Sequence, residues 1–346
     1  MNSFSAEILR WFRENGRDLP WRETKDPYAI WLSEIILQQT RIVQGWEYWE
    51  RFMQTYPKVE DLAAASEDDV LKLWQGLGYY SRARNLHAAA KQIVALGSFP
   101  NTLDGIKSLK GVGDYTAAAI GSFAFDIPAA VVDGNVYRVL SRYFGIDTPI
   151  NSTQGKKEFA ALAQSLLPAS DAASYNQGMM DFGAIQCTPQ SPKCLLCPLA
   201  ETCEALRSGR VEELPVKNKT VKVKTRHLSY IYIRCKSSVA DGSGIPEPMV
   251  AIHRRGEGDI WQGLWEPYNV SDVKELPSFV KNPILLAKDV KHVLTHRILL
   301  ADFYLLETET CPQLPDDYIW IKESEIEDYG VPRLIEIMLE KINPAE

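Results

Sequence analysis

A glutamate interrupts an otherwise apolar helical pattern near the start of the chain. Glu34 lies within the stretch Trp31–Thr40, and at helical spacing it shares a face with apolar side chains such as Ile30 and Leu37. A carboxyl group in such surroundings loses its hydration, which raises its pKa and lets it keep a proton near neutrality. Glu34 therefore has the properties of a general acid, although a buried, fully hydrogen-bonded glutamate is the structural alternative.

A second carboxylate follows a short apolar run and precedes another helical pattern. Asp133 comes after Ala-Val-Val and before Gly-Asn-Val, where the N–H groups of a helix N-terminus are expected to keep it ionised. A protonated acid and a charged carboxylate together suit cleavage of a glycosidic bond through an oxocarbenium-like state. Taken singly, Asp133 is also explained as an ordinary helix cap.

Four of the six cysteines lie within 17 residues, at Cys187, Cys194, Cys197 and Cys203. Thiolates this close in sequence can bind one metal centre. A structural zinc site more often uses two separate Cys-x2-Cys pairs, and only one is present here. Ligation by thiolates alone also suits a 4Fe–4S cluster, so the spacing favours iron–sulfur and leaves zinc as the alternative. The other two cysteines, Cys235 and Cys311, stand alone in the sequence.

A glycine pair between two helical patterns could hold an anion. Gly111 and Gly113 allow a sharp turn and a close backbone approach. The helix that follows offers unpaired N–H groups to a phosphate. A plain helix–helix turn is the alternative for this short motif.

Composition places the chain among ordinary globular proteins. The chain is 45% hydrophobic and 24% charged, with a net charge of −7. Its length of 346 residues exceeds that of one typical domain, so two domains are expected. An acidic chain that contacts nucleic acid must do so through local patches and backbone amides. No apolar run is long enough for a membrane span and no signal-peptide pattern is present, so we expect a soluble, intracellular, cytoplasmic protein.

The elements that must position these residues change in type along the chain. Up to about residue 206 the pattern predicts short helices, at 6–14, 28–40, 67–75, 81–96, 115–125 and 136–143. Strands are expected later, at 228–234, 249–253, 298–306 and 318–321, with a final helix starting near Pro332. The fold class is therefore an all-α domain followed by a smaller α+β domain. We assign residues 1–210 to the first, 211–226 to a basic linker with Lys219 and Lys222, and 227–346 to the second.

The first 206 residues resemble the helix-hairpin-helix DNA glycosylases, a superfamily that includes endonuclease III. The resemblance rests on the glycine hairpin, on residues 132–136 and on the cysteine spacing. Residues 19–22, 31–40 and 76–87 look more narrowly like the adenine DNA glycosylases of the MutY type, which remove adenine mispaired with 8-oxoguanine. The resemblance implies a 4Fe–4S cluster in loop 187–203 and excision of a flipped adenine from A:8-oxoguanine or A:G pairs in double-stranded DNA.

The resemblance also implies roles for single residues of the helical domain. Glu34 would protonate adenine N7, and Asp133 would stabilise or transiently trap the sugar cation. Tyr115 and Asn135 would support the two carboxylates. The adenine pocket would be lined by Trp21, Arg22, Leu37, Ile42 and Gln177. The DNA-contacting residues would be Gln39, Leu77, Tyr79, Gly111 and Gly113, with Gln39 and Tyr79 filling the space left by the flipped base.

The C-terminal part resembles the Nudix-like domain that reads 8-oxoguanine in this family. Residues 261–267 look like the approach to a Nudix box, but residues 268–283 lack the carboxylates of a pyrophosphatase metal site. Thr295 and His296 fall where the family often has Ser and His, and Leu294 replaces its Phe, so both are candidates for lesion contact. His296 is equally explained as a surface residue of a strand.

One departure predicts the reaction type. Tyr115 stands where lyases such as endonuclease III have a Schiff-base lysine, so we predict a monofunctional glycosylase. We separately expect the protein to be a monomer. The alternatives are an oxidised-pyrimidine glycosylase with lyase activity and a non-catalytic iron–sulfur DNA-binding protein.

Overall fold

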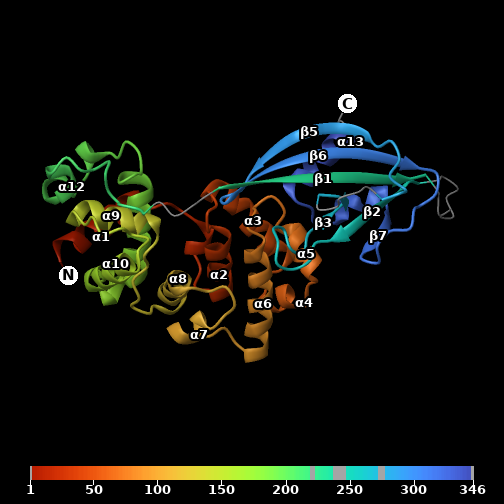
Figure 1. Cartoon of the computed structure of the whole chain (residues 1–346). Coiled ribbons are helices and arrows are strands. Elements are labelled where there is room, and N and C mark those ends of the chain that lie inside the picture. Colours follow the sequence, from red (N-terminus) through yellow and green to blue (C-terminus); the bar gives the residue numbers. More distant parts are fainter. Residues whose placement is uncertain (1, 219–222, 237–246, 272–276, 344–346) are drawn as a thin grey trace. The chain divides into compact units, whose positions relative to one another are not determined.

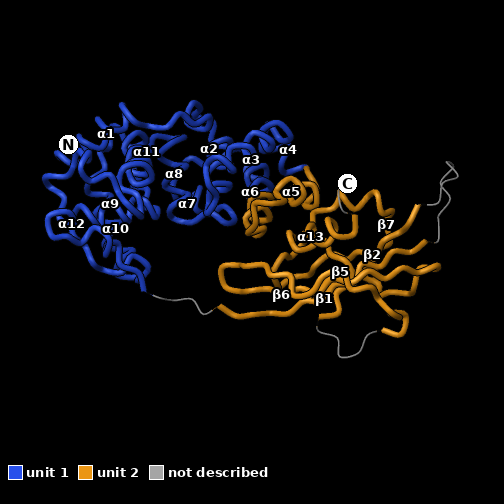
Figure 2. Tube along the Cα trace, turned by 90° about the horizontal axis from the view of Figure 1, so that it is seen from above, with its two compact units in different colours: residues 1–64, 88–220 blue, residues 65–87, 221–346 orange. Residues whose placement is uncertain are grey.

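The computed structural model describes residues 2–218, 223–236, 247–271 and 277–343. The chain forms two compact units (Figure 2): one contains residues 1–64 and 88–220, and the other contains residues 65–87 and 221–346. The division drawn from the sequence placed residues 65–87 in the first domain, whereas their contacts group them with the C-terminal residues. Lys219 and Lys222 of the expected linker lie outside the described residues, and Lys224 already belongs to a strand.

The first unit is built from helices in its described part (Figure 1). They are α1 (Ser3–Asn15), η1 (Pro20–Arg22), α2 (Pro27–Ile36), α3 (Ile42–Thr55), α4 (Val59–Ala64), the second half of α6 (Ser81–Leu96), α7 (Leu103–Lys107), α8 (Asp114–Phe125), α9 (Gly134–Phe144), α10 (Thr153–Leu166), η2 (Ala169–Asp171), α11 (Ala172–Asp181), η3 (Phe182–Gln186), η4 (Cys194–Leu196), η5 (Ala200–Thr202) and α12 (Glu204–Arg207). Among the described residues, no helix is long and apolar enough to cross a membrane.

Helix α2 is the buried centre of this unit. Its N-terminus is capped by Asp26, whose side chain accepts a hydrogen bond from the backbone N–H of Tyr28 at 3.0 Å. Every residue from Tyr28 to Ile36 is buried. The helix ends at Ile36, four residues earlier than the sequence predicts, and Gln39 just beyond it takes a left-handed conformation with φ of 58°. The short helix thereby points Glu34 into the unit and leaves Gln39 exposed.

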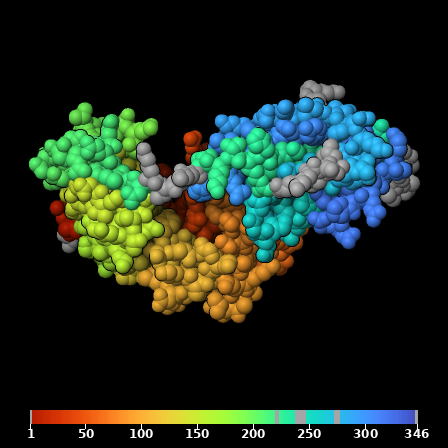
Figure 3. All heavy atoms as spheres, viewed as in Figure 1, coloured from red at the N-terminus to blue at the C-terminus, as the bar shows by residue number. Residues whose placement is uncertain are grey.

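Helix α9 starts at a carboxylate cap and ends at a glycine. The Asp133 side chain accepts from the N–H of Val136, and Gly145, with φ of 69°, ends the helix. Its apolar face packs in one core with residues of α1 and α11. Helix α12 contacts α9, and in Figure 3 the green surface of the α12 segment adjoins the yellow-green surface of the α9–α10 segment.

The second unit contains a mixed sheet of seven strands within its described residues. The strands are β1 (Lys224–Cys235), β2 (Met249–Arg254), β3 (Trp265–Glu266), β4 (Tyr268–Asn269), β5 (Ile284–Val293), β6 (Arg297–Thr308) and β7 (Tyr318–Lys322). The main order is β3-β2-β1-β6-β5, with β4 paired to β1 and β7 paired to β2. Strands β1 and β6 run parallel, and the other pairs are antiparallel. The helices of this unit are α5 (Glu67–Leu73), the first part of α6, η6 (Glu323–Asp328) and α13 (Arg333–Ile342).

Side chains of β1 alternate between two cores, as a strand requires. Tyr230 and Tyr232 pack with Leu334 and Met338 of α13, which covers one face of the sheet, while Ile231 and Ile233 pack in a second cluster on the other face. The predicted order of a helical part followed by an α+β part is therefore confirmed.

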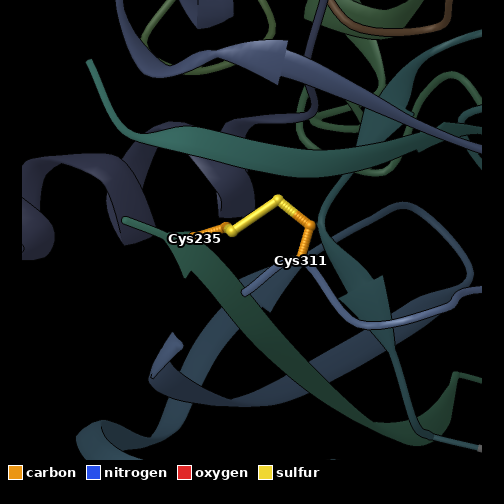
Figure 4. Close-up of a disulfide and its surroundings, with 2 residues drawn as sticks. All are labelled: Cys235 and Cys311. Atoms are coloured by element: carbon orange, nitrogen blue, oxygen red, sulfur yellow. A yellow bond between two sulfur atoms is a disulfide. The ribbon is translucent and has the colours of Figure 1, made fainter. Parts of the chain in front are cut away.

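The two cysteines that stand alone in the sequence form a disulfide (Figure 4). Cys235 and Cys311 are 76 residues apart, yet their Cα atoms lie 5.3 Å apart. The parallel register explains the pairing, because Cys235 lies opposite Thr308, three residues before Cys311. The sequence alone gives no sign of this pairing, since the contact depends on a strand pairing that only the fold reveals.

Candidate active site

A cavity of about 220 Å³ opens in the first unit and gathers the predicted catalytic residues. Every residue predicted for catalysis or for the adenine pocket lines it: Trp21, Arg22, Glu34, Leu37, Ile42, Tyr115, Asp133, Asn135 and Gln177. Elements far apart in the sequence supply them, chiefly η1, α2, α8, α9 and α11. The volume and the mixed polar and apolar lining suit a single flat base.

Glu34 has the properties expected of a general acid. Its side chain is buried, and its Oε2 accepts a hydrogen bond from the Tyr115 hydroxyl at 2.8 Å. Burial raises its pKa to about 7, and the charge of Asp133 adds to that rise, while the Tyr115 hydrogen bond and the Arg22 cation oppose it. The predicted upward shift is confirmed, so the carboxyl can carry a proton at neutral pH.

Asp133 is held by the N-terminus of α9. It accepts hydrogen bonds from the Val136 N–H at 2.8 Å and from the Asn135 side-chain amide at 2.7 Å. Arg138 donates in turn to the Asn135 side-chain oxygen at 2.8 Å. Burial nevertheless raises the pKa of Asp133 above its usual value, although these donors oppose the rise. The helix N–H groups thus act in the predicted direction, but burial outweighs them, and the sequence does not reveal how deeply the carboxylate is buried.

The pocket also contains residues that sequence reasoning missed. Arg17 lines it, and a buried carboxylate behind it, Asp181, binds both Arg17 and Arg22. Trp21 is held edge-on by Trp46 and Trp49, at centroid distances of 5.9 and 5.7 Å. The signal that could have found Asp181 is its position one helical turn after Gln177, on the same face of α11.

The glycine hairpin is formed as the sequence predicts. Gly111 takes φ of 76°, a conformation that favours glycine, and Gly113 precedes α8 without any side chain capping the helix. The Lys110 N–H is already used, because it donates to the Gln92 side chain at 2.7 Å. The N-terminus of α8 thus has no capping side chain, and an ion pair joins Lys107 to Asp114, the first residue of the helix.

The second unit brings together two of the residues predicted to contact the lesion. Tyr79 is 47% exposed, has φ of 47°, and its hydroxyl shares a hydrogen bond with the Thr295 hydroxyl. Thr295 and His296 are exposed in the turn between β5 and β6. Leu77, also predicted to contact DNA, is only 9% exposed, so its side chain supports the turn and does not present a surface.

Several bonds join residues 65–87, which include Tyr79, to the C-terminal residues of this unit. Arg84 donates to the Gln262 carbonyl at 2.6 Å, Arg254 pairs with Glu67 at 2.8 Å, and Lys72 donates to the Tyr329 carbonyl at 3.3 Å. The hydrogen bond between Tyr79 and Thr295 is therefore one of several contacts that join these two segments of the second unit.

The four clustered cysteines surround one small cavity with Arg142. The Arg142 guanidinium is buried and lies 3.4 Å from the Cys187 sulfur, so it can balance negative charge on the thiolates. In the described ranges no three His, Cys, Asp or Glu side chains are arranged to hold a metal ion. Thiols spread around a cavity fit a multi-iron cluster better than zinc, whose ligands must converge to about 2.3 Å from one ion.

Three family models match separate parts of the chain. Residues 32–168 match the HhH-GPD superfamily base excision DNA repair protein, and residues 187–203 match the iron-sulfur binding domain of endonuclease III. Residues 246–341 match the NUDIX domain.

One relative of known name extends the match over nearly the whole chain. An adenine DNA glycosylase of Buchnera aphidicola subsp. Schizaphis graminum is 31% identical over 350 residues, which is 97% of this chain and 98% of that protein. The chain belongs to the adenine DNA glycosylase family. The mouse adenine DNA glycosylase is 41% identical over 229 residues, which cover 62% of this chain and 44% of the mouse protein.

Solved structures agree on the fold of the helical part. A thermostable thymine-DNA glycosylase is 34% identical, with a TM-score of 0.56 over 59% of this chain and 95% of that one. An endonuclease III–DNA covalent complex, at 22% identity and a TM-score of 0.52, shows the fold alone. For this adenine DNA glycosylase family member, the predicted fold class, enzyme class and 4Fe–4S cluster are confirmed. Cys187, Cys194, Cys197 and Cys203, the predicted ligands, lie within the matched iron–sulfur segment.

Proposed function

We propose that this glycosylase is monofunctional and releases adenine from A:8-oxoguanine and A:G pairs in duplex DNA, with Glu34 as general acid and Asp133 as the stabiliser of the sugar cation. The observation that carries the proposal is one pocket holding a carboxyl with a pKa of about 7 next to a second, hydrogen-bonded carboxylate. The pocket can take a base only after it has left the stack, at a cost of a few kcal/mol.

The chemistry follows from these two groups. Glu34 donates its proton to adenine N7, so the electron pair of the breaking C1′–N9 bond moves into a neutral leaving base. Asp133 lies where its negative charge opposes the positive charge that develops on the sugar. Water then adds to C1′ and loses a proton, which leaves an abasic site and a Glu34 carboxylate to be reprotonated. Tyr115 and Asn135 hold the two carboxylates by the hydrogen bonds described above.

The lining of the pocket supports hydrolysis without strand cleavage. Tyr115 donates to Glu34, and none of the described residues that line the cavity is a lysine. A Schiff base with C1′ needs an amine at the sugar. Without one in the pocket, the reaction ends at the abasic site.

Recognition of the opposite base is assigned to the second unit. The Tyr79 ring is exposed at a left-handed turn, and its hydroxyl is joined to the exposed Thr295 hydroxyl. An aromatic ring can stack in the duplex, and a neighbouring hydroxyl can donate or accept a hydrogen bond at the lesion edge. Together they support reading of 8-oxoguanine despite the Leu294 and Thr295 departures.

A single-turnover assay on cluster-loaded protein tests the proposal. The substrates are duplexes with one A:8-oxoguanine, A:G, A:T or thymine-glycol pair, each analysed with and without hot alkali. We expect strand breaks only after alkali and only with the first two duplexes. Breaks without alkali would contradict the monofunctional assignment, and cleavage at thymine glycol would favour an oxidised-pyrimidine enzyme.

A further inference from the structure

A completely buried carboxylate lies directly behind the adenine pocket. Asp181 is the last residue of α11, has 0% exposure, and follows the pocket residue Gln177 by one turn. It accepts hydrogen bonds from the Arg17 backbone N–H at 2.9 Å and from the Arg17 Nε at 3.0 Å, and a further one from the Arg17 Nη2. Arg22 donates to both carboxylate oxygens at 2.8 Å. Burial alone would raise the pKa of Asp181, but these donors outweigh it and lower the pKa.

Both arginines that Asp181 binds are pocket residues. Arg17 and Arg22 line the cavity that contains Glu34, and Arg22 also donates to the Arg17 carbonyl at 3.0 Å. A bidentate contact fixes the plane of a guanidinium as well as its position. The Arg22 side chain can therefore meet a base in only one orientation while Asp181 holds it.

Asp181 also sets the charge next to the general acid. Two arginines and one carboxylate carry a net charge of +1 in this cluster, and without the carboxylate the net charge would be +2. The groups that act on Glu34 are the Tyr115 hydroxyl from α8, the Asp133 carboxylate before α9 and the Arg22 cation from η1. Among them, only Arg22 is a cation, and Asp181 is its buried counter-ion.

We propose that Asp181 is a positioning residue of the glycosylase reaction, which orients Arg22 and Arg17 toward the flipped adenine and offsets their charge so that Glu34 stays protonated. The inference deepens the proposed function and rests on the assignment of Glu34 as the acid. Asp181 does not touch the base, since it does not line the cavity; it acts through the two arginines.

Removal of the Asp181 charge has two consequences. In Asp181→Asn the amide cannot accept both bidentate arginine contacts, so Arg22 loses its fixed orientation. A small misplacement of a positioning group costs up to about 100-fold in rate. The uncompensated cations also favour ionised Glu34, so the pH at which activity is lost should move down on the order of one unit.

The experiment is a single-turnover pH profile on A:8-oxoguanine duplex, with the full-length, cluster-loaded protein. Asp181→Asn should lower the rate about 10–100-fold and shift the alkaline midpoint to lower pH. The matched control is Asp126→Asn, which alters an exposed aspartate paired with Lys25 in the same unit and should leave rate and midpoint unchanged. A loss of rate that is equal at every pH would overturn the proposal, because destabilisation alone moves no midpoint.

A second variant keeps the test decisive if Asp181→Asn does not fold. In Arg17→Gln the carboxylate faces Arg22 alone, the net charge falls to zero, and the midpoint should move to higher pH. A shift to lower pH, or none, would contradict the charge argument. Glu34→Gln distinguishes failure of the proposed function from failure of the Asp181 role. If Glu34→Gln remained active, the proposed function itself would fail. If Glu34→Gln were inactive but the pH profiles of Asp181→Asn and Arg17→Gln were unshifted, only the role of Asp181 would be removed.

Discussion

Two buried glutamates, one in each unit, have opposite acidity. Glu34 is 7% exposed and accepts from the Tyr115 hydroxyl at 2.8 Å, and Glu266 is 2% exposed and accepts from the Tyr230 hydroxyl at 2.9 Å. Burial raises the pKa of Glu34 to about 7. Burial acts in the same direction on Glu266, but its other partners outweigh it and lower the pKa. Burial beside a tyrosine is therefore not sufficient to make a general acid.

The difference lies in which groups surround each carboxylate. Glu266 is contacted by His253 at 2.9 Å and by the Arg255 guanidinium at 2.5 Å, and both partners favour the ionised form of the carboxylate. Glu34 has a second carboxylate, Asp133, in the same pocket, and the Arg22 cation near it is bonded to Asp181. A buried carboxyl stays protonated at neutral pH when its hydrogen-bond donor is neutral and nearby cations are paired with other groups.

The largest effect is expected from Glu34→Gln. An amide cannot protonate adenine, so single-turnover excision should fall by a factor of about 10²–10⁴, the usual contribution of general acid catalysis. Binding to an A:8-oxoguanine duplex, measured by fluorescence anisotropy, should be nearly unchanged. Glu266→Gln is the matched substitution in the other unit and should retain catalysis in the same assay. Full activity of Glu34→Gln would favour a different acid or a non-catalytic role.

Glu266→Gln should instead reduce stability. It leaves the buried Arg255 with Asp259 as its remaining carboxylate partner, at 2.8 Å. Breaking a buried ion pair costs about 3–5 kcal/mol, and the remaining partner places the expected loss near the lower end. Urea unfolding at pH 7.5 measures it, with the exposed Glu307→Gln as control. A loss below about 0.5 kcal/mol, the size of an ordinary surface substitution, would mean that Glu266 is not the main counter-ion of Arg255.

The pH dependence of stability should have opposite signs for the two glutamates. The folded-state pKa of Glu34 is about 7, above its usual 4.5, so its contribution is fully present below pH 4.5 and is lost as pH rises through 7. Over that window wild type should lose up to about 3 kcal/mol relative to Glu34→Gln. Glu266 has a lowered pKa, so its contribution is present above pH 4.5 and is lost as pH falls through its folded value. Unfolding curves at pH 4.5, 6 and 8 test the Glu34 contribution, and curves from pH 4.5 downward, compared with Glu266→Gln, test the Glu266 contribution. Parallel curves for wild type and Glu34→Gln between pH 4.5 and 8 would contradict the assignment of Glu34.

Local sequence signals predicted much of the fold and most of the pocket. The helix at 81–96 has the predicted bounds. Glu34 is recognisable because it interrupts an apolar stretch, and Asp133 because it follows one. Strand β5 (Ile284–Val293) was missed, because its exposure does not alternate regularly and its pairing with β6 contains register shifts.

Contacts between distant segments were not predictable in this way. Asp181 is 159 residues from Arg22, and Cys235 is 76 residues from Cys311. Nothing near either residue in sequence indicates its partner, since the contact follows from the packing of whole elements. The grouping of residues 65–87 with the sheet is a further case, because it depends on contacts such as Arg84 to Gln262. The raised pKa of Asp133 was not predictable from local sequence either, since burial is a property of the assembled fold.

The smallest expected effect comes from the one feature that the two glutamates share. In Tyr115→Phe, Glu34 loses the hydroxyl that favours its ionised form, so its pKa should rise further above 7. One hydrogen bond to a charged group contributes about 1.5–3 kcal/mol before compensation, which limits the shift to roughly one to two pH units. The single-turnover pH profile should move to higher pH, opposite to the shift expected for Asp181→Asn. Tyr143→Phe is the control, since that ring packs against Phe4 and Phe144 and does not line the pocket. A shift of the Tyr115→Phe profile to lower pH would mean that the hydroxyl favours the protonated acid, and the tyrosines beside Glu34 and Glu266 would then have different roles.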